Sequence, residues 1–468
     1  MNRSMFAVSS GKAHTTGPTW IPNDPLFPKQ WGLKLIRAPQ AWAIERGSED
    51  VVIAVIEEGF DYDHPDLRNK WVRPAKWLDP SKVDPGMIAH GSHVAGIAAA
   101  ETDNGIGIAG VAPGCKILPI ACASWDELVL SRAIRHAANE EARVISMSWA
   151  HLSYERLHRH DNPSVAFRRN RYGIPLTDEL MEAVEYAESR GVLLCRGESD
   201  NAVFNAMLYP GYYGHIINVG ATDKKGHRSD MCGYGDCMDI LAPAGWRGGA
   251  DPGDGSPQPP LPEDAPPEAS FSESGPTYGT LSAGLANGGT PGEYWEQSGH
   301  CQAVPHVSGV AALVFARHPE WSPLQVRQVL LNSARGKGWS PYFGHGLLDA
   351  YGAVKVDRFE TELEIVEASI APKGGVFDVT VQLANRGIQD AKDIPVVVWT
   401  SMPNEGLGVQ IAYRIVDLIR GFEQRQVQLR IALADDAKSP VVMVDPIRAR
   451  SVRQIKDGVR YLFHQIKG

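Results

Sequence analysis

The sequence predicts an α/β fold with a doubly wound parallel sheet and helices on both faces, followed by a small all-β sandwich. Apolar, β-branched runs such as residues 51–56 are typical of strands buried on both faces of a parallel sheet. These runs alternate with stretches of helical length, as in doubly wound domains. Further along, apolar and polar residues alternate, as in 376–383, which is typical of antiparallel strands with one solvated face. We therefore expect a tail at 1–19, the α/β domain at 20–356 and the sandwich at 357–468.

Each element of the α/β domain is predicted from its local pattern. A polar arm with a short helix precedes the first strand, which ends in the carboxylates of Glu57 and Glu58. Ser322 and Pro323 are the N-cap and first-turn residues typical of a helix start, so a helix is expected through about Asn332. The other predicted elements are helices at about 90–100, 126–141 and 176–190, and strands at 116–121, 144–148 and 191–195.

Two polar stretches interrupt this alternation. They span about 151–172 and about 244–292. The second is dominated by Pro, Gly, Ser, Asp and Glu, a composition that buries too little apolar surface to order itself. We interpret both stretches as insertions into the α/β domain.

The composition excludes several classes of function. The net charge of -9 argues against a nucleic-acid partner, which requires a basic surface. No segment is apolar and long enough for a signal peptide or a membrane span, so we expect a cytoplasmic protein with no membrane partner. The six cysteines form no CxxC pair and no zinc-binding spacing, which favours reduced thiols. No organic cofactor is expected.

Three separated residues have the chemistry of a nucleophile, a base and an orienting acid. Glu57 lies at the carboxyl end of the first strand, where ligands bind in open α/β sheets. His90 opens the Ala-rich helix that follows. Cys301 lies between small, loop-forming residues and an apolar run with helical spacing, so its thiol is expected at a helix N-terminus, which favours a thiolate. The alternative is a buried free cysteine at the start of a core helix.

Several motifs occur in the order found in one known family. They are Ile53 to Gly59, Asp63 to Leu67, His90 to Gly96, Gly110 to Pro113, Asn218 to Asp223 and Ser298 to Gly309. On these motifs the chain resembles the subtilases, the subtilisin-like peptidases of family S8, and in particular their thermitase-like branch, over roughly residues 20–354. The resemblance implies a subtilisin-like peptidase domain with a triad in the order acid, histidine, nucleophile. It also implies a peptide or protein substrate.

The chain departs from this family at two of the three triad positions. Glu57 stands where the family has Asp and Cys301 where it has Ser, so only His90 is retained. A thiol ionises more easily than a hydroxyl and is intrinsically more nucleophilic, so it can work with a less ideal acid. We predict hydrolysis of peptide bonds by a Cys-His-Glu triad. The alternative is a catalytically inactive pseudopeptidase that acts as a peptide-binding or scaffold protein.

The positions that would bind the substrate carbonyl and side chain also differ. Glu198 aligns with the family's oxyanion-hole Asn, although either of the next two residues could occupy that position. An ionised Glu198 would repel the developing negative charge, whereas a protonated one could donate a hydrogen bond. The strand that lines the substrate pocket reads Ser148, Trp149 and Ala150, which is bulkier than in the family and would narrow the pocket.

Two further features leave alternatives open. His300, beside the nucleophile, is either a second acid–base group or an exposed loop histidine, and we favour the exposed histidine. The C-terminal sandwich could bind a protein partner or substrate, but its sequence indicates no particular ligand.

The resemblance also implies a structural Ca²⁺ site. The matching positions are the carboxylates of Asp24 and Asp66, the side-chain oxygen of Asn104, and the carbonyls of Glu101, Ile106 and Ile108. Carboxylate, amide and carbonyl oxygens are the ligands that Ca²⁺ prefers. The alternative is that these are turn residues whose Asp and Asn side chains bond only to local backbone.

Overall fold

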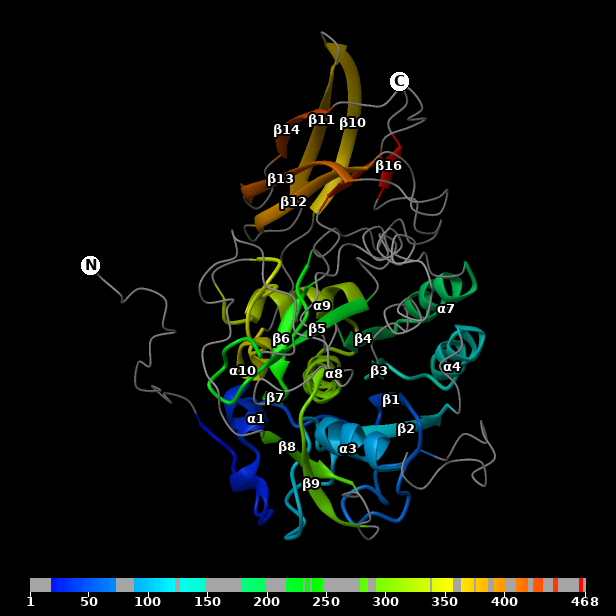
Figure 1. The fold of residues 1–468 in the computed structure, drawn as a ribbon, viewed down its shortest axis with the longest axis vertical. Coiled ribbons are helices and arrows are strands. Elements are labelled where there is room, and N and C mark those ends of the chain that lie inside the picture. The colour runs from blue at the N-terminus through cyan, green and yellow to red at the C-terminus, as the bar shows by residue number, and fades with distance from the viewer. Residues whose placement is uncertain are drawn as a thin grey trace, which may run out of the picture.

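The computed structural model describes the core of the α/β domain and the strands of the C-terminal domain (Figure 1). The described residues are 18–72, 88–122, 127–148, 178–197, 216–229, 232–235, 238–246, 278–284, 292–336, 339–356, 363–373, 376–385, 391–399, 410–419, 424–431, 441–444 and 463–465. The predicted insertion at 151–172 and most of the one at 244–292 lie outside them.

The α/β domain is built on a sheet of six parallel strands. In spatial order these are β2 (Lys116–Ala121), β1 (Val52–Glu57), β3 (Val144–Met147), β4 (Leu193–Gly197), β5 (Ile216–Thr222) and β6 (Ile240–Pro243). The chain leaves β1 on one side for β2 and then crosses to the other side for β3, so β1 lies at a topological switch point. The interiors of these strands are buried on both faces, as their apolar runs predicted.

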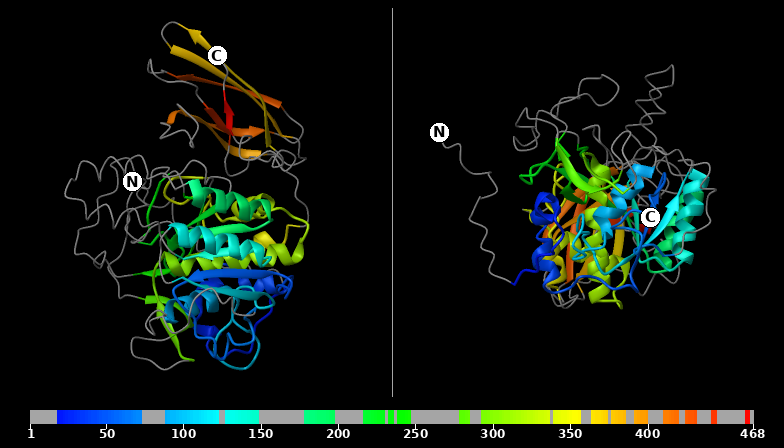
Figure 2. Two further views of the ribbon diagram at one scale, coloured as in Figure 1. Left: turned by 90° about the vertical axis from the view of Figure 1, so that its right-hand side faces the viewer. Right: turned by 90° about the horizontal axis from the view of Figure 1, so that it is seen from below.

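Helices cover both faces of the sheet (Figure 2). On one face lie α4 (Glu127–Asn139) and α7 (Asp178–Ser189), and on the other lie α3 (Ile88–Ala99) and α8 (His300–Arg317). Successive residues of β1 point to opposite faces. Ala54 and Ile56 therefore pack in the core beneath α4 and α7, whereas Ile53 and Val55 pack in the core of α3 and α8. The predicted doubly wound fold is confirmed.

Shorter helices complete the domain. The N-terminal arm forms η1 (Phe27–Lys29), α1 (Trp31–Leu35) and α2 (Ala38–Trp42) rather than the single short helix predicted. α9 (Pro323–Ser333) begins as predicted, because Ser322 Oγ accepts a hydrogen bond from Gln325 N and the Gln325 side chain accepts one from Ser322 N. α10 (Ala350–Val354) follows near the end of the domain.

The strand predicted at 191–195 instead runs from Leu193 to Gly197. Gly191 has a φ of 85°, and the N–H of Val192 still bonds to Ala187 O, so residues 191–192 belong to the end of α7. The strand therefore ends two residues later than predicted. This shift places Gly197 at the carboxyl edge of the sheet.

Part of the second predicted insertion forms regular strands, which its composition did not predict. Tyr278–Ala283 form β8, which pairs antiparallel with β7 (Gly245–Trp246) and β9 (Tyr294–Gln297). This small sheet is attached to α3, because Ser282 Oγ donates to His93 O and the His93 ring bonds to Thr280 O. The average polarity of the stretch conceals this short strand.

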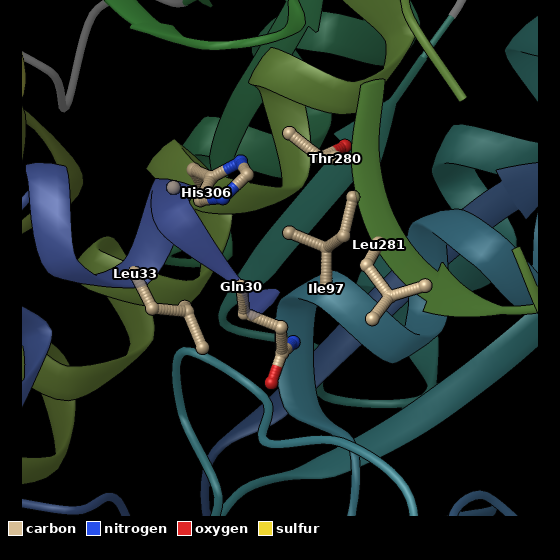
Figure 3. Close-up of a pocket in the computed structure, with 7 residues that line it drawn as sticks. Gln30, Leu33, Ile97, Thr280, Leu281 and His306 are labelled. Atoms are coloured by element: carbon tan, nitrogen blue, oxygen red, sulfur yellow. The ribbon is translucent and has the colours of Figure 1, made fainter. Parts of the chain in front are cut away.

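A small cavity lies between the arm, α3, β8 and α8 (Figure 3). It is lined by Gln30, Gly32, Leu33, Ile97, Thr280, Leu281 and His306. The His306 Nδ1 bonds to Gln302 O, and burial lowers the pKa of His306 to about 4, so the ring is neutral at physiological pH. These residues are core packing beneath α8.

The C-terminal domain consists of two antiparallel sheets (Figure 1). One contains β10 (Leu363–Lys373), β11 (Val376–Asn385) and β14 (Gln424–Ile431), and the other contains β13 (Gln410–Ile419), β12 (Ala391–Trp399), β15 (Val441–Val444) and β16 (Phe463–Gln465). Every second residue of β11 is buried, at Val379, Val381 and Leu383, as the alternation predicted. The exact domain bounds stay a prediction, because 357–362 lie outside the described residues.

Candidate active site

Glu57 and His90 form an ion-pair geometry at the carboxyl edge of the sheet. Glu57 is the last residue of β1, and His90 lies in the first turn of α3, with 2.8 Å between His90 Nδ1 and Glu57 Oε2. The short distance depends on Gly91, because a Cβ at that position would collide with the Gly59 carbonyl oxygen and crowd Glu57. An Nδ1–H that donates to the carboxylate leaves the other ring nitrogen available for a second partner.

Cys301 lies in the first turn of the 18-residue helix α8. The N-cap, Gly299, offers no side chain to cap the helix, so the first N–H groups and the dipole act on the side chains nearby. Cys301 and His90 act on each other's titration: His90 lowers the pKa of the thiol, and Cys301 raises the pKa of His90. The thiol also lies 3.8 Å from His300 Nε2. Glu57, His90 and Cys301 therefore lie near one another at this edge of the sheet, and their roles stay predictions.

The electrostatics of this cluster favour a charged pair. Burial raises the pKa of the Cys301 thiol, but His300 and His90 together hold the pKa below its ordinary value. Burial lowers the pKa of His90, but the Glu57 carboxylate and Cys301 raise it, so that the pKa of His90 stays well above its usual range. These two shifts favour a thiolate beside an imidazolium, which is the reactive form of a cysteine nucleophile.

His300 is buried, so the expectation of an exposed loop histidine is wrong. Its side chain is 3% exposed because α8 begins at His300 itself and carries the ring into the domain. The ring lies over Gly197, where a side chain of any size would collide with it. The sequence does not predict this burial, because it depends on two distant positions, a glycine at a strand end and a histidine at a helix start.

The predicted oxyanion and substrate-pocket residues are only partly described. Ser148 follows β3, is buried, and its Oγ has no hydrogen-bond partner among the described residues. Glu198, Trp149 and Ala150 lie outside the described residues. Their roles stay predictions.

The predicted calcium ligands Asp24, Asp66 and Asn104 lie together. Asp24 accepts hydrogen bonds from the backbone N–H groups of Asp103 and Asn104, at 2.9 and 3.2 Å. Asp66 accepts from Asn104 Nδ2 and from the N–H of Ile108, both at 2.9 Å. Burial raises the pKa of both aspartates, and the Asp66 carboxylate adds to the rise at Asp24.

The loop from Glu101 to Ile108 surrounds these two carboxylates. The backbone N–H of Glu101 donates to Asp66 O, and the N–H of Ile106 donates to Asn104 Oδ1. Two buried carboxylates with an amide oxygen and nearby carbonyls form a donor set that fits a hard cation such as Ca²⁺. No cluster of three or more His, Cys, Asp or Glu side chains suited to a metal occurs among the described residues.

Comparison with known proteins agrees with the fold and with the motifs around this site. The subtilase family of peptidases, S8, matches residues 48–352, so the chain belongs to the subtilase family. It is 30% identical over 346 residues to thermitase of Thermoactinomyces vulgaris, a match that covers 72% of this chain and 100% of that protein. It is 28% identical over 341 residues to a thermophilic serine proteinase of a Bacillus species, covering 72% and 69% of the two chains. These similarities support the thermitase-like branch.

Solved structures show the same fold. A protease from Pseudoalteromonas arctica matches with a TM-score of 0.53 at 24% identity, covering 71% of this chain and 98% of that one. The epidermin leader peptide processing serine protease of Staphylococcus aureus matches with a TM-score of 0.51 at 21% identity, covering 73% and 83%.

No helix in the described part of the chain has the length and hydrophobicity needed to cross a membrane.

Proposed function

We propose that this subtilase hydrolyses peptide bonds with Cys301 as its nucleophile. The observation that carries the proposal is the His90 imidazole held at 2.8 Å by Glu57, together with a Cys301 thiol in the first turn of α8 whose pKa His90 lowers. The related Bacillus protein is named a serine proteinase, which supports a peptide or protein substrate. The proposal retains His90 as the acid–base group and assigns Glu57 the role of orienting it.

The chemistry proceeds in two halves. The Cys301 thiolate adds to the carbonyl carbon of the peptide, and the His90 imidazolium then donates its proton to the leaving amine, which leaves a thioester on Cys301. In the second half neutral His90 takes a proton from water, and the hydroxide attacks the thioester and releases the acid. The Glu57 carboxylate orients the ring and stabilises the imidazolium each time it forms. Backbone N–H groups in the first turn of α8 are donors that would stabilise the developing oxyanion.

A peptide chloromethyl ketone tests this function directly, because the thiolate displaces chloride and forms a stable thioether. We expect intact mass measurement and peptide mapping to find a single adduct on Cys301, and Cys301→Ala to form none. An active enzyme should also cleave the matching fluorogenic peptide. Labelling spread evenly over several cysteines, with no peptide cleavage, would instead support a catalytically silent peptide-binding protein. The sandwich domain stays a candidate for binding a protein partner.

We also propose that Asp24, Asp66 and Asn104 hold a structural Ca²⁺ with carbonyls of the 101–108 loop. When bound, the ion would offset the mutual repulsion of two buried carboxylates that share this small region. The arm already depends on this loop, because Leu26 N donates to Gly107 O and Gly105 N to Asn23 Oδ1. The ion would therefore tie the N-terminal arm to the domain.

Removing calcium should lower the melting temperature. We expect excess EDTA to reduce the Tm by about 5 °C or more relative to calcium-saturated protein, because a ligand that binds only the folded state stabilises it by mass action. Differential scanning calorimetry with and without EDTA measures the shift. Asp66→Asn should lose most of this calcium dependence. Identical melting curves for the wild-type protein in EDTA and in calcium would contradict the site.

A further inference from the structure

Two imidazoles lower the pKa of the Cys301 thiol, of which the proposed mechanism uses one. His90 is held by Glu57 and acts as the acid–base group. His300 lies with its Nε2 3.8 Å from Cys301 Sγ, within hydrogen-bond range for sulfur. The His300 ring is fixed between the start of α8 and the backbone of Gly197 at the end of β4. A buried polar ring fixed beside a nucleophile is expected to take part in its chemistry.

The position of the ring suits a donor to an oxyanion. A donor stabilises the oxyanion when it lies about 2.7–3.1 Å from that oxygen. The reacting oxygen lies on the order of 3 Å from the nucleophile. The oxyanion can therefore lie about 3 Å from both Cys301 Sγ and His300 Nε2, because these two atoms are only 3.8 Å apart. One N–H can bond to the oxyanion while the ring remains beside the sulfur. Gly197, beneath the ring, precedes residues 198–200, among which the resemblance places the family's side-chain donor.

We propose that His300 is a catalytic residue whose Nε2–H stabilises the Cys301 thiolate in the resting enzyme and the oxyanion in the transition state. The proposal rests on the peptidase function above and deepens it by naming the donor that completes the site. His300 keeps its proton throughout the cycle, and no covalent bond to it forms or breaks. All proton transfers remain with His90.

Among the described residues, few charged groups other than His300 affect the pKa of the Cys301 thiol. The groups that act on the Cys301 thiol are His300 and His90, and Glu57 lies behind His90. The next residue after Gly197 is Glu198, which lies outside the described residues. An additional carboxylate there would make a neighbouring donor such as His300 more important for binding negative charge.

Two substitutions at position 300 separate the donor from the bulk of the ring. His300→Gln retains an N–H near the position of Nε2, whereas His300→Leu fills the space without a donor. We expect kcat/KM for a fluorogenic peptide to fall about 100-fold or more in His300→Leu, and less than about tenfold in His300→Gln. We also expect the pH midpoint for alkylation of Cys301 by iodoacetamide to rise by about one unit in His300→Leu, and to stay close to wild type in His300→Gln.

His306→Gln is the matched control. His306 is buried on the same helix but bonds to the Gln302 carbonyl instead of the thiol, so its replacement should leave the alkylation midpoint unchanged. The alkylation assay contains no peptide, so it tests His300 even if the protein proves to cleave none. An unchanged midpoint in His300→Leu, or a kcat/KM within about threefold of wild type, would overturn the proposal.

A second pair covers the case in which His300→Leu does not fold. The amide of His300→Asn is too short to reach the position of Nε2, so Asn should behave like Leu while Gln behaves like His. Equal values for the Asn and Gln variants would overturn the proposal as well. Thermal melting of each variant confirms that the comparison is made on folded protein.

Discussion

Replacing Cys301 by serine is expected to lower kcat/KM for peptide hydrolysis by about 10⁴-fold or more, although serine is the residue that the family uses there. The reason is that this site stabilises a thiolate. His300 and His90 lower the pKa of the thiol, and the same surroundings cannot bring the far more weakly acidic hydroxyl of serine to ionise at neutral pH. A serine would depend on an acid–histidine pair whose acid is one methylene longer than the family's aspartate.

Steady-state hydrolysis of a fluorogenic peptide measures this loss, with active-site concentration fixed by protein mass. Cys301→Ala is the control, because it removes the nucleophile with little change in volume, and we expect it to be at least as inactive as the serine variant. A serine variant within about tenfold of wild type would show that sulfur is not required and would contradict the thiolate account.

Replacing Glu57 by glutamine is expected to lower kcat/KM by about 10³–10⁴-fold and to move the alkaline limb of its pH profile to lower pH. The carboxylate raises the pKa of His90. Without it the imidazolium loses its proton at lower pH, so the general acid needed for amine departure disappears sooner as the pH rises. The acid limb, which reflects protonation of the thiolate, depends on Cys301 and shifts less.

Glu57→Asp is the informative partner to this variant. It keeps the charge but shortens the side chain, so a misplacement of about 1 Å should reduce kcat/KM on the order of 100-fold and leave the alkaline limb near its wild-type position. The pH dependence of kcat/KM for all three proteins measures both effects. Coincident alkaline limbs in wild type and Glu57→Gln would show that Glu57 does not control the proton affinity of His90.

Much of the fold could be predicted because the relevant signals are local. The β-branched run of β1 and the Ser322 cap need only their own neighbours to specify a strand and a helix start. The bounds of β4 were harder to predict, because they depend on where α7 ends. The turn at Gly191 and Val192 closes that helix, and β4 begins only after it. The strand β8 could not be predicted from its own residues, because pairing with β9 and contact with α3 stabilise it.

The candidate site was predictable where motifs identify residues and unpredictable where packing places them. Glu57, His90 and Cys301 stand in motifs, and the structure brings them together at the switch point of the sheet. His300 takes its position from Gly197, more than a hundred residues away, and from the exact first residue of α8. The sequence around His300 contains no pattern that indicates either the packing against Gly197 or the first residue of α8.

The central claim is that His90 keeps the Cys301 sulfur in its reactive form within a site shaped for peptides. The most direct measurement is the second-order rate at which a peptide electrophile captures Cys301 near pH 7, in wild type and in His90→Ala. We expect wild type to react at least about 100-fold faster than a simple thiol, and His90→Ala to lose most of that advantage. A wild-type rate equal to that of a simple thiol and unaffected by His90→Ala would contradict the account.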